Sequence, residues 1–323
     1  MSLQGGARRV GYYAVNSILD ALPSRVHQWR RNQILAELEK RPLSPYEQAR
    51  LDYYNKLETE FNLQKSVAIS AISRKRTFYY YDLKYYANCF NSKQNLLYVF
   101  GDVTAIPKEP AIVKSRPITD DNHNSVIMKL DRLRHYYFIR DPYSFRQKRP
   151  LAVWRGVMNN VARNALIEGH AGKPYCDVAD IGVPREGRPK MENFLSRENQ
   201  LRYKYIISIE GNDVATNLKW IMASNSLCIM PTPKYETWYA EGMLVPGFHF
   251  ALVNEDFSDL KEVIDHYEAN PDKAEAIIQN AHVYVAQFRD KRREDLLSYL
   301  VLEKYLRLAN PARQAAQEPS FAS

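Results

Sequence analysis

The segment from residue 205 to residue 253 constrains the fold of this 323-residue chain most strongly, because two apolar stretches flank a polar turn there. The stretches 205–209 and 227–230 have the length and composition of buried strands. The turn 210–213 opens with Glu210 and Gly211 and leads into a segment that predicts a helix of about ten residues. Folds of the α/β class present backbone N–H groups to phosphate at such a strand end. We therefore expect a nucleotide-sugar pocket here, with Glu210 placed to accept ribose or sugar hydroxyls.

Bulk composition sets wider limits. The length accommodates two domains of ordinary size, and 45% hydrophobic with 25% charged residues is typical of a globular protein. The 45 Lys and Arg residues exceed the 37 Asp and Glu residues, which gives a formal net charge of +8. Such a surplus favours anionic partners, such as nucleotide phosphates, a lipid or glycolipid surface, or nucleic acid, although it also serves solubility alone.

The cysteines and the apolar runs indicate the compartment. Cys89, Cys176 and Cys228 are widely spaced and form no CxxC pair, so we expect buried or idle thiols, without disulfides or a zinc site. No apolar run reaches the roughly 18 residues of a membrane span, and the N-terminal segment lacks the apolar region of a signal peptide. These features predict a soluble cytoplasmic protein, and peripheral contact with an anionic inner membrane stays open.

Alternating patterns predict the architecture. Residues 13–60 are expected to be helical, with a capping box that runs from Ser44 to Glu47. Further helices are expected at 159–168, 259–269 and from 271 to about 308. Strand-like stretches occur at 67–72, 78–81, 95–100, 112–115, 152–154, 201–209, 227–229 and 249–253. Strands that alternate with helices indicate a parallel, doubly wound sheet, and two such α/β domains facing a cleft are the simplest assembly.

A carboxylate at a predicted strand end is the candidate general base. Asp102 follows Gly101 directly after the strand at 95–100, where a side chain would point into the ligand crevice. An ordinary turn aspartate is the alternative explanation. Other candidates for the same role are Asp120, Asp121, His123 and Asp141.

Cationic and polar residues form the candidate donor site. Arg155 and Gly156 end the strand at 152–154, and Arg163 lies about two helical turns further on. Arginine binds diphosphate through its planar fork, although a surface arginine beside a strand–helix turn explains the same spacing. Trp238 and His249 are candidates for lining the cleft. Within the segment 205–230, the candidates are Glu210, Gly211, Asn212, Asp213, Asn217 and Lys219, with the N–H groups of residues 212–215 facing phosphate.

Taken together, these motifs resemble glycosyltransferase family 90, which includes the Rumi-type protein O-glucosyltransferases and the sugar transferases of capsule and lipopolysaccharide. The resemblance covers roughly residues 95–308. It is carried by the motifs Gly101-Asp102, Trp154-Arg155-Gly156, Lys204-Tyr205, Glu210-Gly211, Leu218-Lys219-Trp220, the turn at 224–227, Trp238, Leu244-Val245-Pro246, His249 and Ser258-Asp259-Leu260. The resemblance implies a GT-B fold of two Rossmann-like domains and inverting, metal-independent transfer from a UDP-sugar, with no cofactor.

The resemblance also implies roles and a domain division. It places Asp102 as the catalytic base and Arg155 with Arg163 in the diphosphate-binding turn. We expect an acceptor-side domain at 1–150 with a helical N-terminal extension, and a nucleotide-sugar-binding domain at 151–285. Residues 286–323 are expected to form a C-terminal helix that packs back on the first domain, and a tail.

Two departures from the family pattern bear on the substrates. Asn217 stands where Rumi-type members have an arginine that grips the diphosphate, so either Lys219 or Arg163 compensates or the donor is bound differently. The signal peptide and retention tail of the eukaryotic members are absent. This favours a bacterial-type member that transfers a glucose- or xylose-type sugar to a lipopolysaccharide or capsule glycan.

Two rival hypotheses remain at this point. The basic charge and the 23 tyrosines allow a non-catalytic protein that binds nucleic acid or an anionic surface, although no nucleic-acid-binding motif accompanies them. Another nucleotide-using α/β enzyme, such as a dehydrogenase, would be expected to carry GxGxxG after a strand, and the sequence does not. Asp120-Asp121 is the nearest approach to a metal-binding acidic pair, and we expect no metal site.

Overall fold

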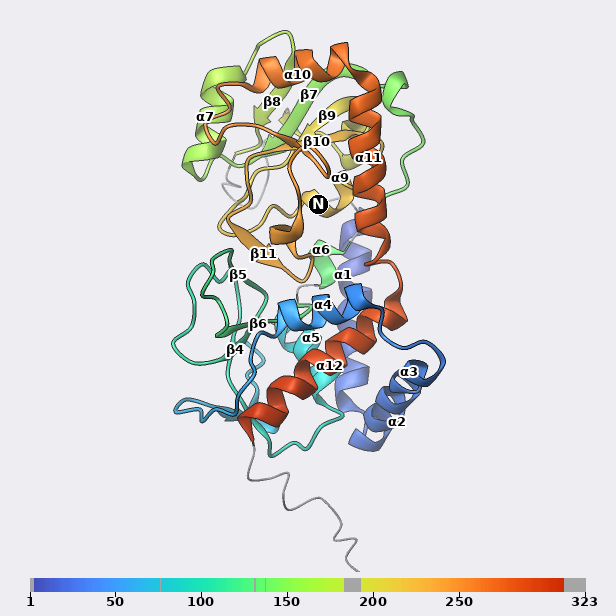
Figure 1. Ribbon diagram of the computed structural model, residues 1–323, viewed down its shortest axis with the longest axis vertical. Coiled ribbons are helices and arrows are strands. Elements are labelled where there is room, and N and C mark those ends of the chain that lie inside the picture. The colour runs from blue at the N-terminus through green and yellow to red at the C-terminus, as the bar shows by residue number, and fades with distance from the viewer. Residues whose placement is uncertain (1–2, 76, 131, 137, 183–192, 311–323) are drawn as a thin grey trace, which may run out of the picture. The chain divides into compact units, whose positions relative to one another are not determined.

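The computed structural model describes residues 3–75, 77–130, 132–136, 138–182 and 193–310, which belong to two compact units (Figure 1). The first unit combines residues 1–133 with residues 290–323, and the second consists of residues 134–289. Contacts thus divide the chain after residues 133 and 289, whereas the sequence predicted divisions after residues 150 and 285.

The second unit is built on a five-stranded sheet in which all paired neighbours run parallel. In spatial order its strands are β12 (Ala251–Leu252), β10 (Leu227–Met230), β9 (Tyr203–Ile207), β7 (Arg149–Gly156) and β8 (Cys176–Asp180). The chain passes from β7 to β8 on one side and then returns to β9 on the other. The order therefore reverses between β7 and β9, which is where open α/β sheets bind ligands. The predicted parallel sheet of the second half is confirmed.

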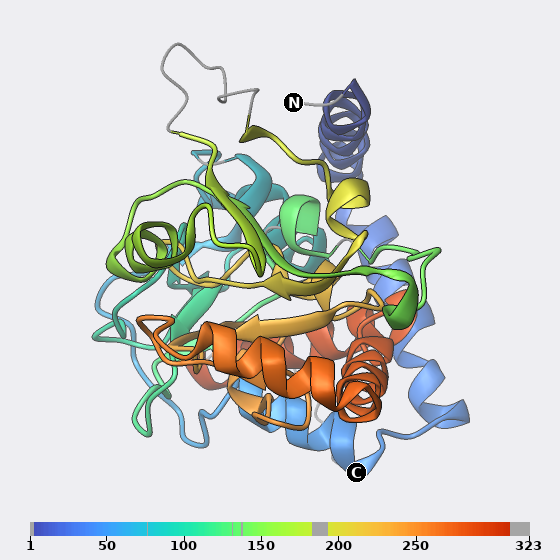
Figure 2. The same cartoon turned by 90° about the horizontal axis from the view of Figure 1, so that it is seen from above.

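One face of this sheet forms the core of the second unit. Alternate residues along neighbouring strands enter a single apolar cluster, as the period of two requires; they include Ala152, Trp154, Tyr205, Ile207, Leu227 and Ile229. Three helices supply the other side of the cluster: α7 (Val161–His170), α10 (Leu260–Ala269) and α11 (Pro271–Ala286). Figure 2 shows α10 running beside the sheet, with α11 next to it and seen nearly down its axis. Short elements complete the unit: α8 (Arg197–Gln200), α9 (Leu218–Ile221), β11 (Tyr235–Thr237), η2 (Phe145–Gln147) and η4 (Glu241–Met243).

The first unit is mainly helical. Its helices are α1 (Leu3–Ala21), α2 (Ser24–Leu35), α3 (Glu37–Lys40), α4 (Pro45–Tyr54), η1 (Ile69–Ala71), α5 (Thr77–Ala87) and α12 (Lys291–Ala309), and α6 (Arg132–His135) spans the division. A parallel sheet joins β3 (Tyr98–Val99), β4 (Ala111–Val113) and β6 (Ser125–Ile127), while β1 (Val67–Ala68) pairs antiparallel with β2 (Asn95–Leu96). The remaining strand is β5 (Ser115–Pro117). Mixed α/β structure with parallel sheets therefore occurs in both units.

Two local predictions in the first unit had opposite outcomes. The capping box is confirmed, since the Ser44 hydroxyl accepts from the Glu47 amide at 3.2 Å and the Ser44 amide donates to the Glu47 carboxylate at 2.9 Å. The strand expected at 78–81 is wrong, because these residues belong to α5. Tyr79, Leu83 and Tyr86 are buried at helical spacing, so tertiary packing overrides the β-propensity of the tyrosines.

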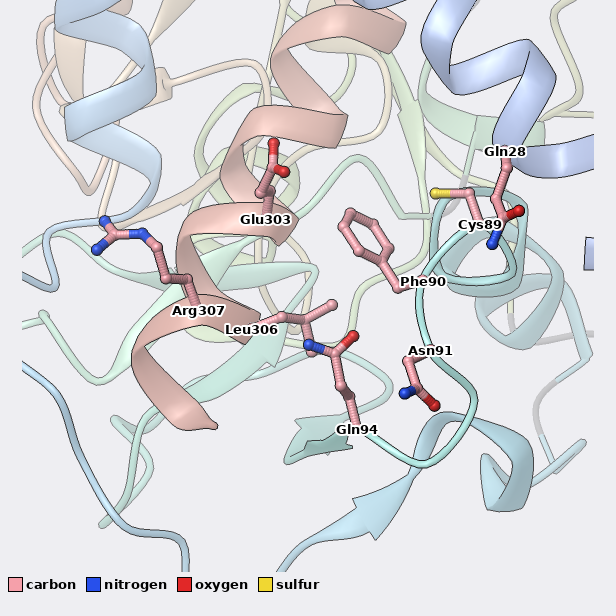
Figure 3. Close-up of a pocket in the computed structure, with 8 residues that line it drawn as sticks. All are labelled: Gln28, Cys89, Phe90, Asn91, Gln94, Glu303, Leu306 and Arg307. Atoms are coloured by element: carbon pink, nitrogen blue, oxygen red, sulfur yellow. The ribbon is translucent and has the colours of Figure 1, made fainter. Parts of the chain in front are cut away.

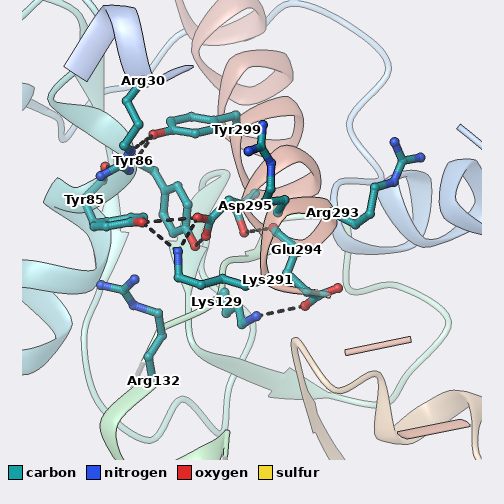
Figure 4. A network of polar contacts seen from close by, with 12 residues as sticks. Arg30, Tyr85, Tyr86, Lys129, Arg132, Lys291, Arg293, Glu294, Asp295 and Tyr299 are labelled. Carbon is teal, nitrogen blue, oxygen red and sulfur yellow. Dashed lines mark hydrogen bonds and ion pairs between the residues drawn. The ribbon is translucent and has the colours of Figure 1, made fainter. Parts of the chain in front are cut away.

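Helix α12 is fixed in the first unit by buried charge as well as by apolar contact (Figure 4). The fully buried carboxylate of Glu294 accepts from Arg50 at 2.8 Å and from Lys129 at 3.0 Å. The next carboxylate, Asp295, accepts from Tyr86 at 2.9 Å and from Lys291 at 2.8 Å. Buried carboxylates need such partners because an unpaired charge in the interior is costly.

The cysteines are buried and free, as predicted. Burial raises the pKa of the Cys89 thiol to about 12 and that of the Cys176 thiol to about 11, so both stay protonated at neutral pH. None of the helices in the described part of the chain has the length and apolar character needed to cross a bilayer.

Candidate functional site

A cavity of about 300 Å³ opens in the second unit at the carboxyl ends of three parallel strands, β7, β9 and β10. It therefore lies beside the point where the strand order reverses. The volume is at the small end of the range for small-molecule pockets. Its walls come from the segments after each strand, which contribute residues 160–162, residues 208–212 with 214, 215 and 218, and residues 230–235, joined by Glu241 and Glu255.

Among the titratable side chains that line the cavity, Glu210 has the pKa that differs most from its ordinary value. Its Oε1 accepts hydrogen bonds from the amides of Lys234 and Tyr235, both at 3.0 Å. Burial raises the pKa of Glu210 to about 7, although these two amides lower it. Among the described residues, no group donates a hydrogen bond to Oε2. The group is thus divided between neutral and ionised forms at neutral pH, and a ligand hydroxyl would favour the ionised form.

The beginning of α7 forms a second wall. Asn160 is its N-cap, and Oδ1 accepts from the Arg163 amide at 3.0 Å. The same side chain donates from Nδ2 to the carbonyls of Glu210 at 2.9 Å and Gly211 at 3.2 Å. Val161 and Ala162, in the first helical turn, line the cavity. The positive end of the α7 dipole is therefore beside the cavity, where it favours an anion.

Arg163 ties the same segments together through carbonyl oxygens. Its guanidinium donates to the carbonyls of Glu210, Ile209 and Val157 at 3.0, 3.2 and 3.2 Å, and to Asn159 Oδ1 at 3.0 Å. Burial lowers its pKa from the usual arginine value, but no acidic side chain in the described chain pairs with it. Its positive charge therefore adds to that of the α7 terminus.

Arg155 and Gly156 are outside the cavity lining. Arg155 turns toward the neighbouring strand β8 and donates to the Asp177 carboxylate at 2.7 Å, to the Asp177 carbonyl at 2.6 Å and to the Asn193 carbonyl at 2.8 Å. Gly156 is required by packing, since a Cβ there would overlap the indole ring of Trp154.

The helix expected directly after Glu210 is wrong. Residues 211–217 form bends and turns, with the Gly211 amide donating to the Asp213 carbonyl at 3.0 Å, and α9 has only four residues. The amides of residues 212–215 therefore do not form a helix N-terminus. Asn212 is exposed and lines the cavity, while Asp213 is buried. The side chain of Asn217 turns inward, to Ser208 at 3.1 Å and to the Ile207 carbonyl at 3.2 Å.

Lys219, Trp238 and His249 are also not part of the cavity wall, and the same holds for Arg163, Asp213 and Asn217. Lys219 is fully buried and forms an ion pair with Glu241, which neutralises its charge. Trp238 is fully buried. His249 accepts the Val245 amide at Nδ1 at 2.9 Å and packs against Tyr284, with ring centroids 5.1 Å apart.

Asp102 belongs to the first unit, just after β3. Gly101 before it has φ 116°, in the region that favours glycine. The Asp102 Oδ1 accepts from Nζ of the buried Lys114 at 2.7 Å, and a third of the Asp102 side chain is exposed. The ion pair holds the carboxylate in one orientation.

Much of the cavity wall was not predicted from the sequence. Glu210, Gly211 and Asn212 were predicted, but Val161, Ala162 and the segment 230–235, which reads Met-Pro-Thr-Pro-Lys-Tyr, were not. The position of that segment, directly after a predicted parallel strand and next to the one ending at Glu210, was available evidence for it. No local sequence pattern indicated that Glu241, which lies in η4, would also reach the cavity wall.

A second cavity, of about 450 Å³, belongs to the first unit (Figure 3). Figure 3 shows Phe90 projecting from the segment after α5 toward α12, with Glu303 and Arg307 on the helix. None of the residues proposed from the sequence lines it. Throughout the described chain, no group of three or more His, Cys, Asp or Glu side chains is arranged to hold a metal ion.

Comparisons with known proteins agree on one family. The model of glycosyl transferase family 90 matches residues 138–317. O-glucosyltransferase LpsA of Dichelobacter nodosus is 42% identical over 310 residues, which cover 94% of this chain and 96% of that protein. Protein O-glucosyltransferase 3 of Rattus norvegicus is 27% identical over 120 residues, 37% of this chain and 23% of that protein. With a family match over more than half of its length and a 42% identical relative over nearly all of it, this chain belongs to glycosyl transferase family 90.

Proposed function

We propose that this protein is an inverting, metal-independent glycosyltransferase of the GT-B type. It moves a glucose- or xylose-type sugar from UDP to a hydroxyl of a lipopolysaccharide or capsule glycan at the cytoplasmic side of the membrane. The observation that carries the proposal is the cavity at the reversal point of the second unit, which combines a buried carboxylate of raised pKa with a helix N-terminus. Membership of family 90 and the O-glucosyltransferase name of the 42% identical relative support it.

The nucleoside part of the donor suits the apolar wall of the cavity. Ile209, Leu218 and Met230 supply a surface for the base, and the 300 Å³ volume holds a portion of the donor while the sugar projects outward. The second oxygen of Glu210 is then the acceptor for ribose hydroxyls. Ribose hydroxyls that donate hydrogen bonds to this oxygen favour the ionised form of Glu210.

The diphosphate is assigned to the beginning of α7. The amides of Val161 and Ala162 and the uncompensated charge of Arg163 stabilise the negative charge that develops on the leaving group. Arg155, held by Asp177, supports the end of β7 in this arrangement. This assignment replaces the cation expected at Lys219, whose charge is already neutralised by Glu241.

Asp102 is assigned as the general base. It takes the proton of the acceptor hydroxyl, whose oxygen forms a bond to the anomeric carbon on the face opposite UDP. The bond from that carbon to the phosphate oxygen breaks, and UDP leaves with the electron pair. The ion pair with Lys114 fixes the orientation of the Asp102 carboxylate that accepts the proton.

The proposal is tested with purified protein, lipooligosaccharide acceptor and UDP-glucose, UDP-xylose or UDP-galactose, with UDP release as the readout. We expect release from a glucose- or xylose-type donor that persists in EDTA, and a melting temperature raised by UDP but not by ADP. Loss of release in EDTA would reject the metal-independent mechanism. Stabilisation by ADP in place of UDP would reject the donor assignment.

A further inference from the structure

Helix α1 has its polar face inward and its apolar face outward. On the inner side, Tyr12 donates to Asp82 and to the Phe78 carbonyl, and Asp20 accepts from Tyr80 at 2.8 Å. On the outer side, the side chains of Val10, Val15 and Ile18 are 70%, 56% and 65% exposed. A helix of a soluble domain normally buries its apolar stripe. The arrangement in α1 is the reverse.

The outward residues follow the helical repeat. Val10, Ala14 and Ile18 recur every four residues and are all exposed, with Val15 on the same side of the helix. They form a continuous stripe along the helix, which we call the α1 stripe. Because α1 packs chiefly against α5 through its other side, the exposure of the stripe is a feature of the folded unit.

Exposed apolar residues continue into α2. Val26 is 41% exposed and Trp29 is 64% exposed. Of the 13 large apolar residues that are exposed in the described chain, five lie between residues 10 and 29. These five are close together in the sequence, and grouped exposed apolar residues are typical of an interaction surface, whereas scattered ones are not.

The charge around the α1 stripe has one sign. Arg8, Arg9 and Arg25 are exposed. Asp20 is the single carboxylate among residues 1–36, and its side chain is 7% exposed because Tyr80 and Asn88 hold it. Residues 7–36 therefore offer cations and apolar side chains at the surface, with no exposed anion.

We infer that α1 and the beginning of α2 form a surface that binds an anionic lipid bilayer. The α1 stripe enters the boundary between headgroups and acyl chains, the arginines contact lipid phosphates, and Trp29 lies at the interface. A second copy of the chain is a poorer occupant, because two such faces bring arginines together with no exposed carboxylate of residues 7–36 to pair them. The inference does not depend on the proposed transfer reaction.

Trp29 makes binding measurable in the intact protein. The other three tryptophans, Trp154, Trp220 and Trp238, are at most 4% exposed. Vesicles of equal parts phosphatidylglycerol and brominated phosphatidylcholine should therefore quench Trp29 selectively and carry the protein to the top of a flotation gradient. Vesicles of phosphatidylcholine alone should bind far less.

Matched variants distinguish the effect of this surface on vesicle binding from the effect of the protein's net charge. Removing Arg8, Arg9 and Arg25 together, as R8Q/R9Q/R25Q, should weaken partitioning roughly 100-fold, since each cation near such a surface contributes about five-fold. The control K173Q/R202Q/K273Q loses the same charge from exposed positions of the second unit and should bind as the wild type does. Val10→Glu should abolish flotation, whereas Val283→Glu, at a valine 75% exposed on α11, should not.

Three results would overturn the inference. They are no flotation with anionic vesicles, equal loss in the control variants, or a dimer in light scattering that Val10→Glu dissociates while vesicles are not bound. The last result would assign the α1 stripe to a second copy of the chain.

Discussion

Arg163 and Glu210 are joined through the backbone, because Nε of Arg163 donates to the carbonyl oxygen of Glu210 at 3.0 Å. The side chain of Glu210 extends instead to the amides of Lys234 and Tyr235. Glu210 thereby connects the segments that follow β7, β9 and β10. A change at either end of this chain of contacts shifts the cavity wall as well as its charge.

Arg163→Ala is expected to weaken UDP binding by about tenfold or more, because it removes the uncompensated charge beside the α7 terminus. Calorimetric titration with UDP and with uridine distinguishes the loss of the Arg163 charge from a change in the packing of the loops. The loss should be much larger for UDP, which carries the phosphates. An equal loss for both ligands would show that Arg163 only holds the loops.

Binding of uridine should strengthen by about tenfold between pH 6 and pH 8, because Glu210 has a pKa of about 7 and accepts ribose hydroxyls when ionised. Glu210→Gln should bind with little dependence on pH. A wild-type affinity that is flat across this range would contradict the ribose assignment.

The same carboxyl gives a stability prediction with a definite sign. Its folded pKa is raised from 4.5 to about 7, so the stability gained from the neutral form is present below pH 4.5 and lost as the pH rises through 7. The melting temperature of Glu210→Gln should therefore rise relative to wild type between pH 5 and pH 8. A difference that is constant with pH would contradict the raised pKa.

Asp102→Asn should lower kcat by about 100-fold to 10,000-fold, the range for a lost general base, while the Kd for UDP is unchanged. Asp121→Asn, at an exposed carboxylate paired with His123, is the matched control and should retain activity. Full turnover in Asp102→Asn would transfer the role to another group.

Gly156→Ala should destabilise the second unit by about 1–3 kcal/mol, because the new methyl group overlaps the Trp154 ring. Gly169→Ala is the control in α7, where a Cβ meets nothing within 4 Å. That change should stabilise the unit by up to about 1 kcal/mol. Thermal unfolding of both variants gives the comparison, and a stable Gly156→Ala protein would show that Trp154 can move.

Glu294→Gln should destabilise the first unit by about 3–5 kcal/mol, because Arg50 and Lys129 lose the charge that balances them. Glu303→Gln removes a carboxylate that is 42% exposed and paired with Arg31, so the expected loss is under about 1 kcal/mol. Hydrogen exchange of α12 in both variants measures the difference within the unit concerned. Equal protection of α12 in the two variants would contradict a structural role for the network.

The features that could be predicted from the sequence are those that depend on neighbouring residues. The strands at 203–207 and 227–230, the carboxylate at the end of the first, and the Ser44 cap each follow from a local pattern. The helix predicted directly after Glu210 is not formed, because the buried apolar residues Val214 and Ala215 lie in a non-helical segment and Leu218 begins the four-residue helix α9. Apolar composition predicts that these residues are buried, but it does not distinguish a helix from an irregular buried segment.

Pairing between distant residues could not be predicted. Arg155 has the composition and place of a phosphate ligand, but Asp177 on β8 comes into contact with it once the two strands align. Lys219 is likewise neutralised by Glu241, 22 positions away. Such contacts depend on strand register and on how η4 packs, and neither is encoded in a local motif.

The path of the chain through its two units has a consequence for biosynthesis. The first unit is closed by α12, whose carboxylates hold Arg50, Lys129 and Tyr86, yet the whole second unit precedes α12 in the chain. During translation the nested unit can complete its sheet while the segments around it still lack their final partner. A nascent chain that ends before residue 290 would leave Arg50, Lys129 and Tyr86 without their carboxylate partners on α12.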